Sequence, residues 1–281
     1  MRIINISNDQ FENLKLLKEG LSLESELYIF DENSILKRLY KDFKEVFDNK
    51  IYTINELSRN EKIINIPELV IPNSIVKLEN ETIGFLVSYI EGNTLEQVLK
   101  SDNYTVKQKI EYLKQIGIIL EKMEKMRNST EVNNFYLNDI HEGNFILNKE
   151  TNKINVIDLD SCKIGNNKEG YSKYLNPLSA ILYVPKYITK NGELKISYNT
   201  ELYCYIIMIL NYIYGNSITN LTVKEYYKFL EYLLKIGLRG ELVDKLSYIY
   251  IDQDNENIYK YLDEFIPYYE KINRGTKKRT F

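Results

Sequence analysis

The segment Tyr136-Leu137-Asn138-Asp139-Ile140-His141-Glu142-Gly143-Asn144-Phe145-Ile146-Leu147 and, after a polar turn, Val156-Ile157-Asp158-Leu159-Asp160 decide the interpretation of this sequence. Asp139 and Asn144 lie between a predicted long helix and an apolar strand, and Asp158 follows a second apolar strand. A hairpin of these strands would bring all three side chains to one rim. Carboxylate and amide oxygens suit Mg²⁺, and a carboxylate beside them can accept a proton from a hydroxyl group.

The composition is that of a globular protein and excludes several classes. The chain has 281 residues, of which 44% are hydrophobic and 27% charged, which argues against extensive disorder. This length predicts one large domain or two coupled subdomains. A net charge of −3, from 37 basic and 40 acidic residues, does not favour nucleic acid as a partner. Two cysteines, Cys162 and Cys204, are too few for a disulfide framework or a cysteine-rich zinc site.

The sequence also predicts a cytoplasmic location. The first residues lack the basic segment and apolar stretch of a secretory signal. The most apolar run, Leu202 to Ile213, is shorter than the roughly 20 residues that span a membrane. We therefore expect this run to form a buried core helix and expect no membrane span.

The first ninety residues have the pattern of short strands. Residues 26–30 and 34–39 alternate around a three-residue turn and predict a β-hairpin. Residues 74–78 and 83–90 predict a second hairpin that turns at 79–81. Apolar residues at helical spacing predict a helix over 52–64. This part is expected to form a small lobe, residues 1–90, built on an antiparallel sheet.

The pattern changes to helices after a predicted hinge at Glu91-Gly92. Apolar positions predict a short helix starting near Leu95 and a long helix over 106–126. Short strands at 145–147 and 154–157 follow, and the chain from about Glu201 is again helical. We predict an α+β fold of two lobes, in which residues 91–281 form a larger, mainly helical lobe and a cleft lies between the lobes.

Asp139-x-x-x-x-Asn144, followed by an apolar strand and Asp158, resembles the catalytic loop and the metal-binding Asp of the protein-kinase-like superfamily. The form Asp-Ile-His-Glu-Gly-Asn, with His141, is closer to the bacterial and aminoglycoside-phosphotransferase-like branch. The resemblance covers roughly residues 10 to 270. It implies ATP and Mg²⁺ as cofactors. It also implies Asp139 as the catalytic base and Asn144 and Asp158 as metal ligands, with Asp160 as a candidate second metal ligand. His141 would contact phosphates or hold the loop.

The resemblance extends into the small lobe and the helical lobe. Lys37, at the end of an apolar strand pattern, resembles the lysine that holds the ATP phosphates, and Glu56 resembles its partner on the first helix, with Glu61 as a rival. The helix from Glu201 resembles the central helix of protein kinases, where Glu201 would accept backbone N–H groups. Residues 85–92 resemble the last small-lobe strand and the hinge. Val87 would then be the gatekeeper residue, and adenine would bond to main-chain groups of Ser88 and Ile90.

The sequence departs from the protein-kinase pattern at several positions. The metal motif reads Asp-Leu-Asp, and Asn138 replaces the usual arginine before the catalytic Asp. A glycine-rich loop is missing, since Gly20 is the one glycine between Leu14 and Ile29. The phosphates would then contact another turn, near Leu21-Ser22-Leu23. Val184-Pro185-Lys186 replaces the Ala-Pro-Glu triplet.

Three functions are consistent with these features. A Ser/Thr-type protein kinase is favoured by the central helix and by the 27-residue span from Asp158 to Pro185. A small-molecule kinase, acting on an aminoglycoside, a choline-like compound or a sugar, is favoured by the D-x-H-x-x-N form and the Asp-Leu-Asp motif. A pseudokinase is favoured by the missing glycine-rich loop. The first two are phosphotransferases that need a protein or small-molecule hydroxyl group as substrate.

Overall fold

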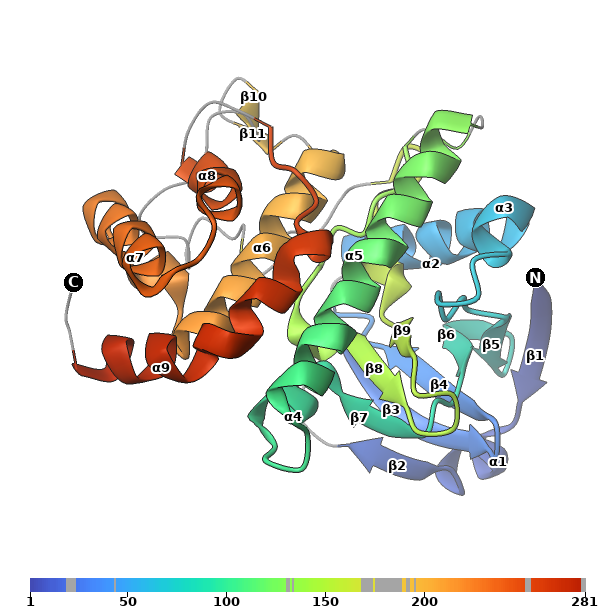
Figure 1. Ribbon diagram of the computed structural model, residues 1–281. Coiled ribbons are helices and arrows are strands. Elements are labelled where there is room, and N and C mark those ends of the chain that lie inside the picture. The colour runs from blue at the N-terminus through green and yellow to red at the C-terminus, as the bar shows by residue number, and fades with distance from the viewer. Residues whose placement is uncertain are drawn as a thin grey trace.

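The computed structural model describes residues 1–18, 24–42, 44–129, 132, 134–167, 174, 189–190, 193–194, 196–250 and 254–278. The predicted phosphate-binding turn near Gly20 and Leu21–Leu23, and the triplet Val184-Pro185-Lys186, lie outside the described residues. The sheet and helix α2 lie on one side of the molecule, helices α6 to α9 lie on the other, and the long helix α5 runs between them (Figure 1). The chain therefore has the predicted α+β architecture.

The small lobe is a six-stranded sheet in the order β1-β5-β6-β4-β3-β2. Neighbouring strands are antiparallel except β1 and β5, which are parallel. The strands are β1 (Arg2–Ile6), β2 (Lys15–Lys18), β3 (Ser25–Asp31), β4 (Ser34–Leu39), β5 (Ser74–Leu78) and β6 (Glu81–Ser88), with the short helix α1 (Asn8–Glu12) after β1.

Both predicted hairpins are present, and the second is tighter than expected. β6 begins at Glu81, so that β5 and β6 are joined by Glu79 and Asn80 alone. These two residues have φ angles of 48° and 74°, as a two-residue turn of type I′ requires.

Helix α2 (Lys44–Arg59) covers the small-lobe sheet and begins eight residues before the predicted start at Tyr52. Its buried positions, Lys50, Thr53, Ile54 and Leu57, follow the i, i+3, i+4, i+7 spacing of one helix face. The predicted helix over 52–64 is divided at Asn60, whose side chain caps α3 (Glu61–Ile64). Lys50, outside the predicted helix, is therefore on the face that packs inward.

The predicted hinge coincides with a close approach between two strands. β7 (Gly92–Thr94) pairs with β8 (Phe145–Asn148), which pairs with β9 (Ile154–Val156). A Cβ atom on Gly92 would lie 2.0 Å from the carbonyl oxygen of Leu147. Any side chain at this position would push the two strands apart, which explains the glycine.

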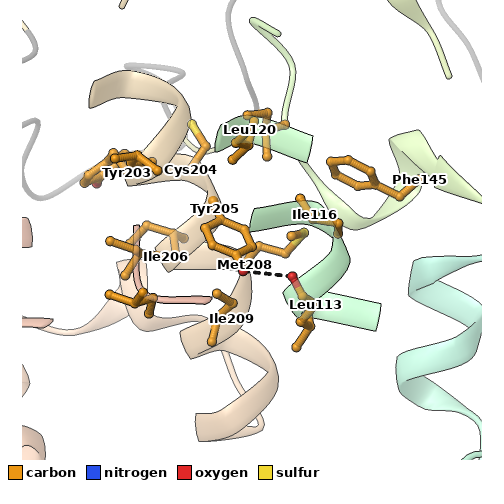
Figure 2. Packing of buried hydrophobic residues seen from close by; sticks show 14 of the residues in the cluster. Leu113, Ile116, Leu120, Phe145, Tyr203, Cys204, Tyr205, Ile206, Met208 and Ile209 are labelled. Atoms are coloured by element: carbon orange, nitrogen blue, oxygen red, sulfur yellow. Dashed lines mark hydrogen bonds between the residues drawn. The ribbon is translucent and has the colours of Figure 1, made fainter. Parts of the chain in front are cut away.

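The helical lobe packs around α6 (Tyr198–Tyr214) and α5 (Val106–Ser129). Leu202 to Ile213 is buried at nearly every position of α6, as expected for a core helix. The hydroxyl of the fully buried Tyr205 donates a 2.8 Å hydrogen bond to the carbonyl of Leu113 on α5 (Figure 2). This bond satisfies a polar group that would otherwise oppose burial of the ring.

Shorter elements complete the fold. They are α4 (Leu95–Lys100), the 3₁₀ helices η1 (Glu142–Asn144) and η2 (Leu159–Ser161), the strands β10 (Thr189–Lys190) and β11 (Glu193–Leu194), then η4 (Ile218–Asn220), α7 (Val223–Ile236), α8 (Gly240–Ser247), η5 (Tyr248–Tyr250), η6 (Tyr259–Tyr268) and α9 (Tyr269–Lys278). No helix in the described part of the chain, α5 and α6 included, has the length and apolar character of a membrane span.

Candidate active site

The loop between α5 and β8 holds Asp139 and Asn144 against each other. The side-chain amide of Asn144 donates to the main-chain oxygen of Asp139 at 2.8 Å and to its carboxylate Oδ2 at 3.2 Å. With its NH₂ group so engaged, Asn144 turns its amide oxygen away from Asp139. The carboxylate is thus oriented, and the amide oxygen faces elsewhere as a hard ligand.

His141 supports the same loop. Its Nδ1 accepts a 3.0 Å hydrogen bond from the N–H of Gly143, at the start of η1. A neutral imidazole then carries its proton on Nε2, and Nε2 lies 3.5 Å from Oδ2 of Asp139. Of the two expected roles, these contacts favour loop support.

Asp158 lies at the end of β9 in a strained backbone conformation. Its φ and ψ are 64° and 37°, the left-handed region that non-glycine residues rarely adopt. A small pocket, with room for about one water molecule, is lined by Asp139, Asn144 and Asp158 together with mostly apolar neighbours. The structure thus brings the three residues of the motif to one rim, and strain of this kind is frequent at functional sites.

Lys37 reaches this rim from β4. Its buried ammonium group contacts the carboxylate of Asp158 and lies 2.8 Å from Oδ1 of Asp160. Burial opposes the charged form, but the two carboxylates outweigh it and raise the pKa of Lys37 above its ordinary value. Lys37 is therefore a cation held inside a carboxylate pair.

The expected ion pair between Lys37 and Glu56 is not formed in this structure. The Glu56 carboxylate lies 3.3 Å from Nη1 of Arg59, one turn along the same helix. Glu56 lies outside the buried stripe of α2, and its side chain is 32% exposed. Its rival Glu61 is exposed at the start of α3.

Lys50 takes the inward position on α2, and the sequence analysis missed it. Its ammonium group lies 2.6 Å from Oδ2 of Asp160, 3.0 Å from Glu24 and 3.3 Å from the hydroxyl of Ser161. Both oxygens of Asp160 therefore accept from lysine ammonium groups.

The two carboxylates of the Asp-Leu-Asp motif respond differently to burial. Burial opposes ionisation of Asp160, but Lys37 and Lys50 outweigh it and hold the pKa of Asp160 well below its usual range. Burial raises the pKa of Asp158 in spite of the nearby Lys37. The charge of Asp160 is thus the more firmly fixed of the two.

β6 leads into the segment predicted to contact adenine, which contains Val87, Ser88 and Ile90. The N–H of Tyr89 donates to the carbonyl of Asn33 at 2.8 Å. Antiparallel pairing alternates, so the main-chain groups of Ser88 point away from β4. On the other side, the pairing with β5 ends at Ser74 and Leu86, where the N–H of Asn73 also donates to the Leu86 carbonyl at 3.0 Å. This geometry suits a main-chain contact with a planar base.

A buried ion pair fixes the start of the loop that holds Asp139. Oε1 of Glu201 accepts a 2.7 Å hydrogen bond from the N–H of Leu137, which confirms that this residue holds the backbone. Oε2 lies 2.8 Å from Nη2 of Arg127, whose Nη1 donates to the carbonyl of Phe135 at 2.9 Å. Burial raises the pKa of Glu201 to about 7, against the opposing effect of Arg127. Arg127 was not predicted.

The donor set fits magnesium only together with a phosphate ligand. Among the described residues, no group of three or more His, Cys, Asp or Glu side chains could hold a metal ion. Mg²⁺ is commonly bound by one or two carboxylates plus substrate phosphates and water. Asp158 and the amide oxygen of Asn144 suit such a site, provided that Lys37 moves from Asp158 to the phosphates.

Comparisons with known proteins identify the fold. The sequence matches no protein-family model and no curated protein. The structure is similar to the apo structure of a pseudokinase, with a TM-score of 0.51 and 14% sequence identity over 97% of both chains. At this identity the similarity shows the fold alone. Together with the sheet-rich small lobe and the helical lobe, it shows that the chain has a protein-kinase-like fold.

Proposed function

We propose that the chain is an ATP- and Mg²⁺-dependent phosphotransferase that moves the γ-phosphoryl group to a hydroxyl acceptor. The observation that supports this most is the single rim lined by Asp139, Asn144 and Asp158, within reach of the buried ammonium group of Lys37. Phosphoryl transfer needs little covalent chemistry from a protein, and such a rim supplies the positioning and charge that it does need.

Each residue has a defined task in this proposal. Asp139, held by Asn144, orients the acceptor hydroxyl and takes its proton. Lys37 would exchange Asp158 for the phosphates. Asp158 and the Asn144 amide oxygen would hold Mg²⁺, whose charge would offset that of the phosphates. Main-chain groups at Ser88 and Ile90 hold adenine.

The favoured acceptor is a Ser or Thr hydroxyl of a protein. The buried helix α6, which anchors the catalytic loop through Glu201, is the feature that supports a protein kinase. The alternative acceptor is a small molecule, supported by the position of His141 beside Asp139.

A pseudokinase is the second candidate function, and one observation favours it. Lys37 is paired with both Asp158 and Asp160, so the cluster satisfies its own charges without phosphates. The similar structure is also named a pseudokinase. Under this alternative, the chain binds a nucleotide or a protein partner and transfers nothing.

Asp139→Asn tests the proposal. Nucleotide affinity, measured by calorimetry with ATP and Mg²⁺, should stay near the wild-type value because Asn keeps the shape of Asp. Transfer of γ-labelled phosphate to the protein itself, to a generic protein substrate and to a panel of small hydroxyl compounds should fall by about 10²–10⁴-fold. The matched control is Asp244→Asn, at an exposed position of α8.

Each outcome separates the candidates. Equal transfer by Asp139→Asn and the wild type, with ATP bound in both, would contradict the catalytic role of Asp139. A wild type that binds ATP but labels no acceptor would favour the pseudokinase. The labelled class of acceptor distinguishes a protein kinase from a small-molecule kinase.

A further inference from the structure

A buried cluster of charges joins three elements around the site. Lys37 comes from β4, Lys50 from α2, and Asp158 and Asp160 from the start of η2. The carboxylate of Asp160 lies at its centre, because one oxygen contacts Lys37 and the other contacts Lys50. Glu24 contacts Lys50 from the rim at 3.0 Å.

The two carboxylates of this cluster differ in exposure. The side chain of Asp160 is 1% exposed, whereas that of Asp158 is 33% exposed. Asp160 presents both oxygens to lysines inside the protein, and Asp158 helps to line the small pocket that Asp139 and Asn144 also line. The Asp-Leu-Asp motif thus has a buried inner carboxylate and a partly exposed outer one.

We propose that Asp160 positions Lys37, and that Lys50 is the residue through which α2 holds Asp160. This inference rests on the proposed function, since it concerns how Lys37 is presented to phosphates. In this arrangement the helix contributes a cation, Lys50, and the loop contributes an anion, Asp160. The sequence analysis had expected the helix to contribute an anion, Glu56, as the partner of Lys37. The proposal gives Asp160 a positioning role in place of metal binding.

This arrangement lets Lys37 change partners without leaving the site. Lys37 has one bond to the exposed Asp158 and one to the buried Asp160. Incoming phosphates replace Asp158 as the partner, which releases Asp158 for Mg²⁺, while Asp160 keeps the ammonium group at the rim. The bond from Lys50 to Asp160 prevents Asp160 from following Lys37.

Lys50 also sets the charge that phosphates meet. The cluster of Lys37, Lys50, Asp158 and Asp160, with Glu24 beside Lys50, contains two positive and three negative charges. Without Lys50 the remaining four groups have a net charge of −2, which repels a polyphosphate, and Asp160 loses the partner of one buried oxygen. A neutral residue at position 50 should therefore weaken nucleotide binding as well as misplace Lys37.

Lys50→Met is the informative variant, and Lys44→Met, at the exposed start of the same helix, is the matched control. Lys50→Met should raise KM for ATP with Mg²⁺ and lower kcat/KM at least about tenfold, as the loss of a supporting group around a site does. Lys50→Arg should restore most of this loss, because it restores the charge. Nucleotide affinity by calorimetry should follow the same order.

Glu56→Gln tests the rival connection. We expect it to lose less kcat/KM than Lys50→Met does. Wild-type kinetics and affinity in Lys50→Met, or a larger loss in Glu56→Gln, would overturn the inference. If Lys50→Met does not fold, Lys50→Gln, which keeps a hydrogen-bond donor without the charge, takes its place.

A second measurement is independent of nucleotide. Denaturant unfolding of Lys50→Met, Asp160→Asn and the double variant gives a double-mutant cycle. The double variant should lose less stability than the sum of the single variants, and additive losses would overturn the Lys50–Asp160 link. A non-additive cycle in a protein that neither binds nor turns over ATP would refute the proposed function and leave this link standing.

Discussion

Replacing Arg127 by Met should destabilise the helical lobe in a way that depends on pH. The substitution keeps much of the side-chain volume but removes the cation beside Glu201, the donor to the Phe135 carbonyl and the bond to Glu124. The Glu201 side chain is 1% exposed, so water cannot replace the lost partner. Removing one member of a buried ion pair costs about 3–5 kcal/mol, and we expect the lower end of this range at pH 7.

The sign of the pH dependence follows from the pKa of Glu201. In the folded protein this pKa is raised to about 7 from an ordinary value of 4.5. Because the carboxyl pKa is higher in the folded than in the unfolded protein, the free energy of unfolding falls as pH rises between the two pKa values. In the wild type this fall ends near pH 7. Without Arg127 the pKa of Glu201 rises further. The variant should therefore continue to lose about 1.4 kcal/mol per pH unit above pH 7, or about 2 kcal/mol more by pH 8.5.

The assay is denaturant unfolding of both proteins at pH 6.0, 7.0 and 8.5. In a Glu201→Gln background, where the carboxyl group is absent, the effect of Arg127→Met should not vary with pH. An equal destabilisation at pH 6.0 and 8.5 in the background with Glu201 intact would refute the electrostatic account. The loss of the bonds to the Phe135 carbonyl and to Glu124 would then explain the result.

Three further substitutions, one with a matched control, test the site and the core. Gly84→Ala would place a Cβ atom 2.0 Å from the Lys37 carbonyl oxygen, so it should lower the free energy of unfolding by about 1–3 kcal/mol in thermal unfolding. The control is Gly240→Ala, where nothing lies within 4 Å of the new Cβ atom. It should change the free energy of unfolding by less than about 0.5 kcal/mol. Tyr205→Phe removes the buried bond shown in Figure 2 and should cost about 1 kcal/mol in the same measurement; an unchanged melting temperature would count against that bond. Asp158→Asn should fold normally, because Asn tolerates a φ of 64°. Mg²⁺-dependent labelling of acceptors should be lost in this variant. Labelling at the wild-type rate would contradict the proposed role of Asp158 as a metal ligand.

Local sequence patterns were sufficient to predict those elements whose pairing partners lie close by in the sequence. The hairpin of β3 and β4 was recognisable because its alternation and its turn lie within a dozen residues. The parallel pairing of Arg2–Ile6 with Ser74–Leu78 was not predicted, since a register between strands some seventy residues apart leaves no periodic signal in either strand. The rim of Asp139, Asn144 and Asp158 was predictable because one short hairpin determines its geometry.

The role of Arg127 could not be predicted from the sequence for a second reason. Its partner Glu201 lies 74 positions along the chain, and on a long helix rich in Lys and Glu a single arginine resembles a solvent-exposed side chain. Its burial could be inferred from spacing alone, because Arg127 lies four positions after the buried Met123. Spacing could not show which acid would meet it, since that depends on how α5 and α6 pack.

Lys50, and not the predicted Glu56, faces the site from α2 because this helix begins earlier than predicted. The predicted helix began at Tyr52 and therefore contained Glu56 but not Lys50. The true helix begins at Lys44, and its buried stripe continues back from Leu57 through Ile54 and Thr53 to Lys50. In a helix of 3.6 residues per turn, Glu56 lies about 60° beyond Thr53, at the edge of that stripe, and its side chain is 32% exposed. A lysine that continues an apolar stripe is desolvated, and a desolvated ammonium group needs an anion. Asp160 is the carboxylate that this requirement selects, because both of its oxygens are buried against lysines.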